Sequence, residues 1–351
     1  MRQDAFVGRR HEIERTLVCA MQGQFPVLIA PGGSELAVVF RVGAGHYGLS
    51  ATLATSRSLD GGSTWSGPIE VWSRGEDVRN PAFGVHGDRW VLAYWEAGKY
   101  SYPSVDGKPR SWRSPRDGGT DPDLFVVTSG DHGETWSARV GYRSEAYAWL
   151  SPYGRIITHD NVLVMSAYGR RRDADKQIDT LIVRSRDGGA TWGDESLVLA
   201  NATETSLCGV GDQLVAAARR NDQSTSITRS SDGGRTWSEP VTVTRAFEHP
   251  ADLCVLRDSR RLMMTFGRRI RPLGCAAITS TDAGVTWDRD REVLLASDGV
   301  GQDVGYPSTQ QIADGTLVTV LYFAHGSAGE EQAHWGETSC QALRYAEALV
   351  S

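Results

Sequence analysis

Polar and aromatic side chains of kinds that take part in catalysis stand at the ends of several apolar runs in the sequence. Glu204 comes just before the run TSLCGV, and Tyr306 directly precedes PSTQQI. Four arginines end two further runs: Arg219, Arg220, Arg268 and Arg269. A carboxylate or an imidazole can transfer a proton, and a phenol can attack an electrophilic carbon. A guanidinium can hold a carboxylate through two parallel hydrogen bonds. Whether these groups meet depends on the fold.

The fold is indicated by an eight-residue box, Ser-x-Asp-x-Gly-x-Thr-Trp, that recurs five times along the chain. The copies are SLDGGSTW at 58–65, SGDHGETW at 129–136, SRDGGATW at 185–192, SSDGGRTW at 230–237 and STDAGVTW at 280–287. The spacings between their aspartates, 71, 56, 45 and 50 residues, are close to those of propeller blades, which repeat roughly every 40 to 50 residues.

Each position of the box has a physical role in a turn. The aspartate accepts backbone N–H groups of its own turn, and the glycine supplies a positive φ. The threonine starts the next strand, and the tryptophan buries a large surface between blades. A turn that recurs in every blade is part of the architecture, so we do not expect the boxes to form a single site.

Two strand-like runs precede each box, and three more follow the last one. The 64 residues beyond Trp287 contain PSTQQI, TLVTVLYF and QALRYAEALV, which predict a further blade without a box. The N-terminal run IERTLVCA can supply its outer strand, which would close the ring and remove open sheet edges. The sequence therefore predicts an all-β fold, a six-bladed β-propeller with blades of four antiparallel strands. It forms a single domain over 1–351, with an inserted loop at about 96–121.

Composition excludes several classes of protein. The net charge of −6 disfavours nucleic acid as a partner, although a local arginine cluster can still bind a small anion. The five cysteines form no Cys-x-x-Cys pair, so we expect no metal and no cofactor, and we interpret them as buried free thiols. The N-terminus has no signal-peptide pattern and the chain has no run of 18 apolar residues. We expect a cytoplasmic protein that does not enter a membrane; the sequence does not indicate its oligomeric state.

The boxes and their spacing resemble the sialidase (neuraminidase) superfamily, whose members carry Asp-box or BNR repeats. The resemblance covers nearly the whole chain. This superfamily includes sialidases, other exo-glycosidases and some polysaccharide lyases. The resemblance implies a site at the propeller axis, built from the starts of each blade's first strand and the ends of its second.

The resemblance also implies a pair of catalytic residues. The fourth blade, TETSLCGVGDQLVAAARR, is similar to the family segment that opens with a catalytic glutamate, and Glu204 takes that position. Tyr306 resembles the family's nucleophilic tyrosine, which stands in a similar Tyr-x-Ser context. A carboxylate nucleophile would be repelled by the carboxylate of sialic acid, so a neutral tyrosine with a glutamate as its base suits an acidic sugar.

Arginines of the carboxylate-binding kind follow from the same resemblance. Arg219 or Arg220 takes one such position, and Arg268, Arg269 or Arg271 takes the next. Neighbours on a strand point to opposite faces, so only one of each adjacent pair is expected to face the axis. His249, at the start of the fifth blade, either lines the centre or holds a turn ahead of Pro250.

Two positions depart from the sialidase pattern. The family's Arg-Ile-Pro element is here Gln24-Phe25-Pro26, so the first arginine is missing, and Arg41 or Arg79 would have to supply its charge. The loop FRVGAGHYG, where the family has an acid/base aspartate, contains neither Asp nor Glu. His46 is its proton-transfer candidate, and Asp298 or Asp303 is the alternative.

Three functions fit these observations. The first is a sialidase-like exo-glycoside hydrolase that acts on a terminal, acidic sugar, with Tyr306, Glu204 and His46 as its catalytic residues. The second is a polysaccharide lyase on uronate-containing glycans, with His46 or Tyr306 abstracting a proton. The third is a propeller that binds carbohydrate without catalysis. In each case the expected partner is a carbohydrate.

Overall fold

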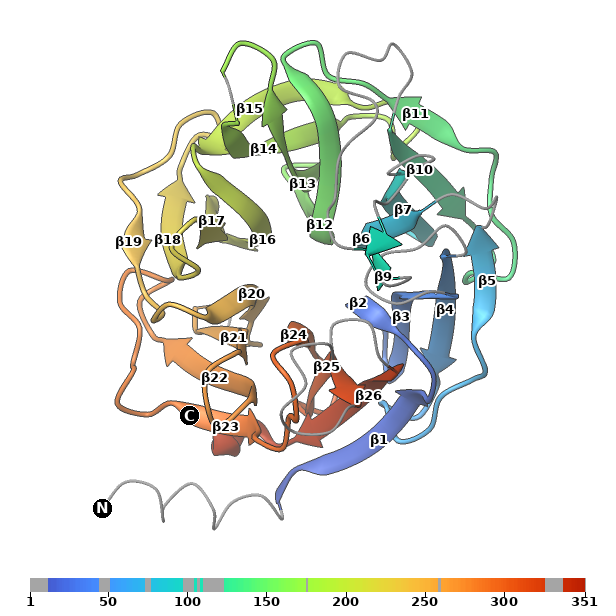
Figure 1. The fold of residues 1–351 in the computed structure, drawn as a ribbon, viewed down its shortest axis with the longest axis vertical. Coiled ribbons are helices and arrows are strands. Elements are labelled where there is room, and N and C mark those ends of the chain that lie inside the picture. Colours follow the sequence, from blue (N-terminus) through green and yellow to red (C-terminus); the bar gives the residue numbers. More distant parts are fainter. Residues whose placement is uncertain are drawn as a thin grey trace.

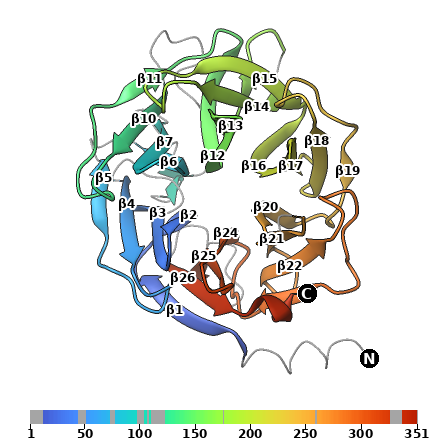
Figure 2. The same cartoon turned by 180° about the vertical axis from the view of Figure 1, so that it is seen from behind.

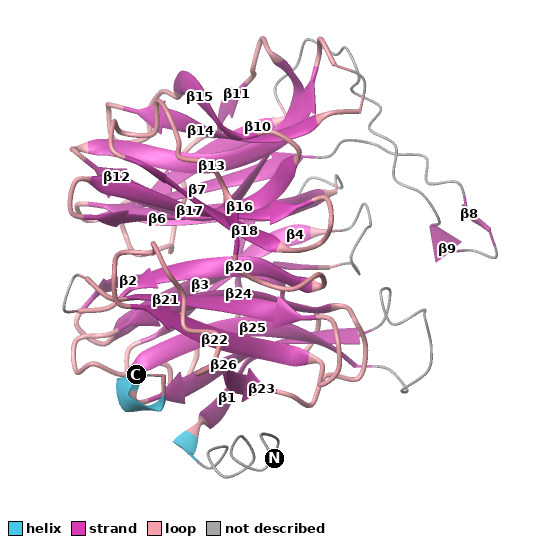
Figure 3. Ribbon diagram, turned by 90° about the vertical axis from the view of Figure 1, so that its left-hand side faces the viewer, coloured by secondary structure: helices cyan, strands magenta, loops and turns pink. Residues whose placement is uncertain are grey.

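Sheets arranged around a central axis make up the molecule. The computed structural model describes residues 12–43, 51–72, 77–96, 104–105, 108–109, 123–174, 176–257, 260–325 and 337–350. Figure 1 looks down the axis, with the first strand of each group innermost, and Figure 2 shows the same ring from behind. In the side view the sheets lie one above another (Figure 3). The prediction of an all-β propeller is confirmed.

Three four-stranded antiparallel sheets are continuous in the sequence. The first contains β2 (Gln24–Gly32), β3 (Glu35–Val42), β4 (Thr52–Ser58) and β5 (Ile69–Trp72). The second contains β16 (Ala202–Val210), β17 (Gln213–Arg220), β18 (Thr225–Ser230) and β19 (Val241–Thr242). The third contains β20 (Glu248–Val255), β21 (Leu262–Arg268), β22 (Gly274–Ser280) and β23 (Val293–Ala296).

The prediction of six separate blades differs from the structure, because eight strands belong to one sheet. One half contains β6 (Val78–His86), β7 (Arg89–Glu96), β10 (Leu124–Ser129) and β11 (Val140–Tyr142). The other half contains β12 (Tyr147–His159), β13 (Val162–Arg171), β14 (Ile178–Ser185) and β15 (Gly193–Leu199). Each half repeats the strand order of the separate sheets, and parallel pairing of β6 with β12 joins them.

A glycine explains why these two innermost strands pair. In the parallel register Gly84 faces Ile156, next to the pair Phe83 and Arg155. A Cβ on Gly84 would overlap the carbonyl oxygen of Ile156. The strands therefore approach to hydrogen-bonding distance only because this position has no side chain.

The ring closes between the two ends of the described chain. The closing sheet has the order β1 (Glu14–Cys19), β26 (Glu337–Tyr345), β25 (Leu317–His325) and β24 (Val304–Gln311). The N-terminal strand β1 is thus the outer strand of the last sheet, as the sequence predicts (Figure 1). A short 3-10 helix, Glu347–Leu349, follows β26. Within the predicted insertion the structure describes only the strands β8 (Ser104–Val105) and β9 (Lys108–Pro109). No helix among the described residues is long and apolar enough to cross a membrane.

Each box forms the same hydrogen-bonded turn. In the third box the Ser185 hydroxyl donates to Asp187 Oδ1 at 2.8 Å, and the backbone N–H of Thr191 donates to the same oxygen at 2.9 Å. The Thr191 hydroxyl donates to Oδ2 at 2.6 Å, and the Gly189 N–H donates to Ser185 Oγ. The aspartate thus satisfies the polar groups of its own turn, as the motif predicts.

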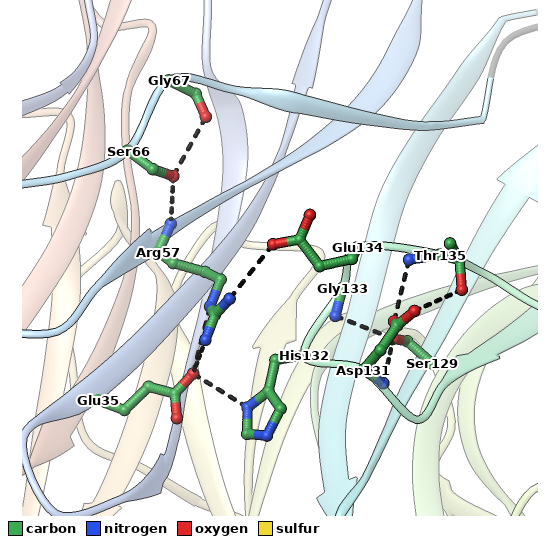
Figure 4. Close-up of polar contacts among 10 residues, drawn as sticks. All are labelled: Glu35, Arg57, Ser66, Gly67, Ser129, Asp131, His132, Gly133, Glu134 and Thr135. Atoms are coloured by element: carbon green, nitrogen blue, oxygen red, sulfur yellow. Dashed lines mark hydrogen bonds and ion pairs between the residues drawn. The ribbon is translucent and has the colours of Figure 1, made fainter.

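The boxes also attach each blade to the one before it. The backbone oxygens of Gly233 and Gly234 accept hydrogen bonds from Arg184 and Ser196 of the preceding blade, at 2.8 and 2.6 Å. The second box is attached through charged side chains instead, those of Arg57 and Glu35 (Figure 4). Glu35 binds the guanidinium of Arg57 at 2.8 Å and His132 of the box at 3.1 Å.

The blade without a box has a substitute for it. There the carboxylate of Glu347, in the C-terminal 3-10 helix, accepts from Gln311 at 2.6 Å and forms an ion pair with Arg261 of the preceding sheet. Leu349 and Val350 are buried in the apolar cluster between these sheets. The C-terminal turn therefore packs one sheet on its neighbour, as the boxes do elsewhere.

The packing of the fourth box on the neighbouring sheet predicts that alanine substitutions of the adjacent glycines Gly233 and Gly234 lower stability by unequal amounts. In Gly234→Ala the new Cβ would overlap Ile182 Cδ1, whereas a Cβ on Gly233 meets nothing within 4 Å. Both glycines have positive φ, 82° and 67°, so the backbone strain is similar. We expect Gly234→Ala to lower the free energy of unfolding by about 1–3 kcal/mol more than Gly233→Ala, as overpacking does. Equal losses in urea unfolding would contradict this contact.

The box aspartates predict a loss of stability in acid. Hydrogen bonds from the threonine hydroxyl and backbone N–H lower the pKa of Asp60, Asp131 and Asp187 from 3.8 to about 2. Between pH 4 and 2 the unfolded chain therefore binds more protons than the folded chain, so this stabilisation is present above pH 4 and is lost as the pH falls. We expect the urea midpoint to fall over this range, and to fall less steeply in Asp187→Asn. The same slope in both proteins would argue against this origin.

Candidate active site

The innermost strands bulge where they approach the axis. In four of them a residue followed by proline occupies the bulge: Phe25, Asn80, His249 and Tyr306. Phe25, Asn80 and Tyr306 share a left-handed backbone, with φ of 54°, 51° and 50°. Such conformations are uncommon for residues with a Cβ and often occur at functional sites. The repeated bulge places these side chains at equivalent positions around the axis.

Tyr306 and Glu204 meet across this centre. The Tyr306 hydroxyl donates a hydrogen bond to Glu204 Oε1 at 2.7 Å, although the residues are 102 positions apart. Both are buried. Glu204 lies on β16 and Tyr306 on β24, with β20 between them in the ring (Figure 1). Burial raises the pKa of Tyr306 well above its ordinary value of 10, and the charge of Glu204 raises it further.

Arg219 holds Glu204 in its charged form. Its Nη1 lies 3.1 and 3.3 Å from the two carboxylate oxygens, and its Nη2 donates to Gln223 at 2.6 Å. Burial raises the pKa of Glu204, but the Arg219 charge and hydrogen bonds from Thr203 and Tyr306 outweigh burial and lower it to about 2. Glu204 is therefore a carboxylate at neutral pH, able to accept the proton of Tyr306.

Arg269 approaches the same tyrosine with free donors. Its Cζ lies 5.7 Å from the centre of the Tyr306 ring. Nε and Nη2 are buried and have no hydrogen-bond partner among the described residues. These two N–H groups form one edge of the guanidinium, the edge that binds a carboxylate through two parallel bonds. Unpaired buried donors cost roughly 1–3 kcal/mol each, so this edge of Arg269 is a candidate for binding a ligand.

His249 is a second unpaired group beside these charges. It is 1% exposed, and neither ring nitrogen has a partner in the described part of the chain. Burial lowers its pKa to about 2, and the nearby charges of Arg219 and Arg269 act in the same direction. The imidazole is therefore neutral at physiological pH, with one N–H donor and one acceptor available to a ligand.

Aromatic rings surround Tyr306. Phe25 packs edge-on at 4.9 Å between ring centres, Tyr322 lies at 5.7 Å and Tyr153 at 6.0 Å. Tyr322 donates to Asp303 Oδ1 at 2.5 Å, which places this buried carboxylate behind the aromatic cluster. A small cavity of about 10 Å³ lies under Tyr306, next to Phe25, Tyr153 and Asp252. The rings fix the orientation of the tyrosine hydroxyl toward Glu204.

The structure also decides between the adjacent arginines. Arg220 donates to the backbone oxygen of Ala200 and not to Glu204, unlike Arg219. Arg268 is buried in an ion pair with Glu292 at 2.6 Å, whereas Arg269 approaches Tyr306. These contacts bring Arg219 and Arg269 to the Tyr306–Glu204 pair and direct Arg220 and Arg268 elsewhere.

Arg41 and Arg79 share a buried carboxylate as their partner. Asp77 accepts from Arg41 at 2.8 Å and from Arg79, and its side chain has no exposed surface. Arg41 also binds Gln24 Oε1 and the backbone of Val78. Arg41 thus belongs to a buried cluster that includes Gln24, the residue at the position of the missing arginine. Arg79 also lies against the Trp95 ring, at 5.3 Å.

The predicted acid/base group is His46, with Asp298 or Asp303 as the alternative. His46 lies outside the described residues. Of the alternative proton donors, Asp298 forms an ion pair with Arg15 at 2.6 Å and is half exposed, away from the axis. Asp303, hydrogen-bonded to Tyr322, is the alternative that the structure brings near Tyr306. The role of His46 stays a prediction.

Asn80 and Tyr168 belong to this region but were not predicted. The Asn80 amide donates to the Tyr168 hydroxyl at 2.7 Å and to Ser151 Oγ at 2.9 Å. Burial raises the pKa of Tyr168, the charge of Glu204 raises it further, and the charges of Arg219 and Arg79 act in the opposite direction. The repeated residue-proline pair at the start of a strand is the sequence signal that could have identified Asn80. Among the described residues no group of three or more His, Cys, Asp or Glu side chains is arranged to hold a metal.

Comparison with known proteins agrees with this arrangement. The family described as BNR repeat-like domain matches residues 102–319. The fold defines the class of protein. It is a propeller whose blades carry the box and whose candidate site is buried at the axis. The chain belongs to the BNR repeat-like domain family, within the sialidase superfamily.

Individual relatives are distant. A sialidase from Bacteroides fragilis is 26% identical over 301 residues, covering 76% of this chain and 53% of the relative. The chain thus spans about half the length of that curated relative. A Dyadobacter fermentans protein of unknown function is 20% identical, with a TM-score of 0.75 over 96% of this chain and all of the other. Trypanosoma rangeli sialidase, in complex with 2,3-difluorosialic acid, is 15% identical, with a TM-score of 0.73 over 96% of this chain and 59% of its own.

The burial of His249 predicts that its ring does not titrate in the physiological range. Its pKa of about 2 lies far below the ordinary 6.5. The ring resonances of His249 are assigned as those that disappear from the NMR spectrum in His249→Asn. We expect their chemical shifts to stay constant from pH 8 to 4. The unfolded chain binds a proton below pH 6.5 that the folded chain excludes, so His249→Asn should lose less stability on acidification. A midpoint near 6.5 for this resonance would contradict the neutral, enclosed ring.

Proposed function

We propose that the protein is a sialidase-like exo-glycoside hydrolase that acts on a terminal sugar bearing a carboxylate. The observation that carries this proposal is the hydrogen bond from Tyr306 to Glu204 beside the unpaired edge of Arg269. A nucleophile, a base and a carboxylate-binding group converge there within one buried site. Similarity to a named sialidase and membership of the BNR repeat-like family support the same reaction class.

The substrate carboxylate would bind on Arg269. In the described part of the site, Arg219 pairs with Glu204, whereas Arg41 and Arg79 share the single carboxylate of Asp77, which compensates one of their two charges. Arg269 has two parallel donors left, enough for one carboxylate. Gln24 stands where a sialidase would have a further arginine, and its Nε2 is buried without a partner among the described residues. It would donate a neutral hydrogen bond to the same ligand. This donor set suits a sugar with a single negative charge.

The reaction would begin with attack of the Tyr306 oxygen on the anomeric carbon. A free phenolate is disfavoured, because burial and the charge of Glu204 raise the pKa of Tyr306. The proton would therefore pass to Glu204 as the carbon–oxygen bond forms, along the existing 2.7 Å hydrogen bond. The glycosidic oxygen would leave with a proton from His46 or, in its place, Asp303. Water would then release the sugar from Tyr306 by the reverse transfer.

Chromogenic glycosides of sialic, glucuronic and galacturonic acids, with galactoside as the neutral control, test the reaction. We expect release from at least one acidic glycoside and none from the galactoside. Tyr306→Phe should reduce turnover to background, and Glu204→Gln should reduce kcat roughly 100-fold or more. Turnover unchanged in Tyr306→Phe would refute the nucleophile. Absorbance of an unsaturated uronate would instead indicate the lyase, and saturable binding without any product would indicate a non-catalytic propeller.

Arg269 and Arg220, one from each pair of adjacent arginines, offer a matched test of carboxylate binding. Arg269→Lys keeps the charge but removes the two parallel donors, so we expect KM for the acidic substrate to rise about 10- to 100-fold. Arg220→Lys serves as the control, since Arg220 contacts the Ala200 backbone and should leave KM unchanged. Equal effects of the two substitutions on KM would show that Arg269 does not hold the carboxylate.

A further inference from the structure

Two cysteines face each other across the seam that closes the ring. Cys19 is the last residue of β1 and Cys340 lies within β26, and the two are partners in the antiparallel pairing, just after a register shift between Leu17 and Cys19. Directly opposed residues in such a pair have Cα atoms about 4.5–5.5 Å apart. Disulfides form at Cα separations of roughly 4.4–6.8 Å. The pairing therefore brings the two backbone positions close to the Cα separation that a disulfide needs.

A neighbouring glycine lies against the Cβ atoms of both cysteines. A Cβ built on Gly23 would lie 2.7 Å from Cys340 Cβ and 3.4 Å from Cys19 Cβ. The two cysteine Cβ atoms thus both adjoin one point beside Gly23. Both residues belong to the same apolar cluster, and the charge of Cys19 acts on the pKa of Cys340. Both thiols are free and buried in the structure.

We propose that Cys19 and Cys340 form a site of oxidative cross-linking, where a disulfide joins the first strand to the last and closes the propeller covalently. In the reduced protein the closing sheet joins these ends by pairing of β1 with β26. A disulfide here would close a loop that contains almost the whole chain, and longer loops give larger stabilisation. The inference is independent of the proposed catalytic activity.

A glutathione disulfide is a suitable oxidant. The Cys19 thiolate, the more exposed of the two at 8% against 0%, would attack one sulfur of the oxidant and release one glutathione. The Cys340 thiolate would then attack Sγ of Cys19 and release the second glutathione. Two thiols are oxidised, one glutathione disulfide is reduced to two thiols, and the protons pass to the glutathiones. Burial raises the pKa of both cysteines, so mildly alkaline pH favours the exchange.

The test treats the full-length protein with oxidised glutathione at mildly alkaline pH and measures its intact mass, disulfide map and thermal midpoint. We expect a loss of two hydrogens, a peptide pair containing Cys19 and Cys340, and a midpoint roughly 5–10 °C higher that reverts with reductant. Cys19→Ser should abolish all three changes. Cys275→Ser, at a buried cysteine on β22, is the matched control and should retain them.

A competing pair makes the disulfide map decisive. Cys208 and Cys254 lie on the neighbouring strands β16 and β20, and the charge of each raises the pKa of the other. A cross-link mapped to Cys208 and Cys254, or one that survives Cys19→Ser, would overturn the proposal. A wild-type protein that keeps all its thiols after prolonged oxidation would overturn it as well, and this result needs no variant to fold.

Discussion

The arrangement of the centre depends on one buried ion pair, between Arg155 and Asp252. Arg155 extends from β12, forms an ion pair with Asp252 of β20 at 3.3 Å, and donates to the backbone oxygens of Leu253 and Thr309. Asp252 also accepts from Ser206 Oγ on β16 at 2.8 Å and from the Thr309 N–H on β24 at 2.7 Å. Four innermost strands are thus tied together at the axis. Removing one partner of such a pair costs about 3–5 kcal/mol, because the other charge is left buried.

The catalytic candidates lie on the same strands, two or three residues before this cluster. Glu204 precedes Ser206, His249 precedes Asp252, and Tyr306 precedes Thr309 by short, fixed lengths of chain. The cluster sets the spacing of these strands, and the bulge at each strand start turns the next side chain toward the axis. The 2.7 Å hydrogen bond between Tyr306 and Glu204 is therefore a consequence of how the innermost strands are held. In this protein the polar core at the axis supports the site, while the boxes at the periphery hold the blades together.

Much of this could be predicted from sequence, because the boxes give the blade register. The resemblance to the sialidase superfamily placed Glu204 and Tyr306 at the axis, within the blades that the boxes indicate, and the structure brings them together. The register could not choose between neighbouring arginines. β17 ends at Arg220 and it is Arg219 that contacts Glu204, whereas β21 ends at Arg268 and it is Arg269, just beyond it, that approaches Tyr306. Strand alternation cannot resolve this difference, since it depends on where each strand stops.

Other features depended on contacts that no motif marks. Asp77 lies outside every apolar run that defines the blades, and its carboxylate forms ion pairs with both Arg41 and Arg79. Gly84, one glycine among 39, permits the parallel pairing that joins two blade-like groups into one sheet. The C-terminal Glu347 replaces a missing box without resembling one. Long-range packing decides all three, so local sequence patterns cannot reveal them.

Trapping of the covalent intermediate tests the central claim most directly. A 2,3-difluoro derivative of the acidic sugar that the protein hydrolyses would react with the nucleophile and be released slowly. The account predicts an intact mass increased by one fluorosugar, with the label on the peptide that contains Tyr306 and none in Tyr306→Phe. A label on a different residue, or no label while the substrate is still hydrolysed, would contradict the assignment of Tyr306 and Glu204 as nucleophile and base.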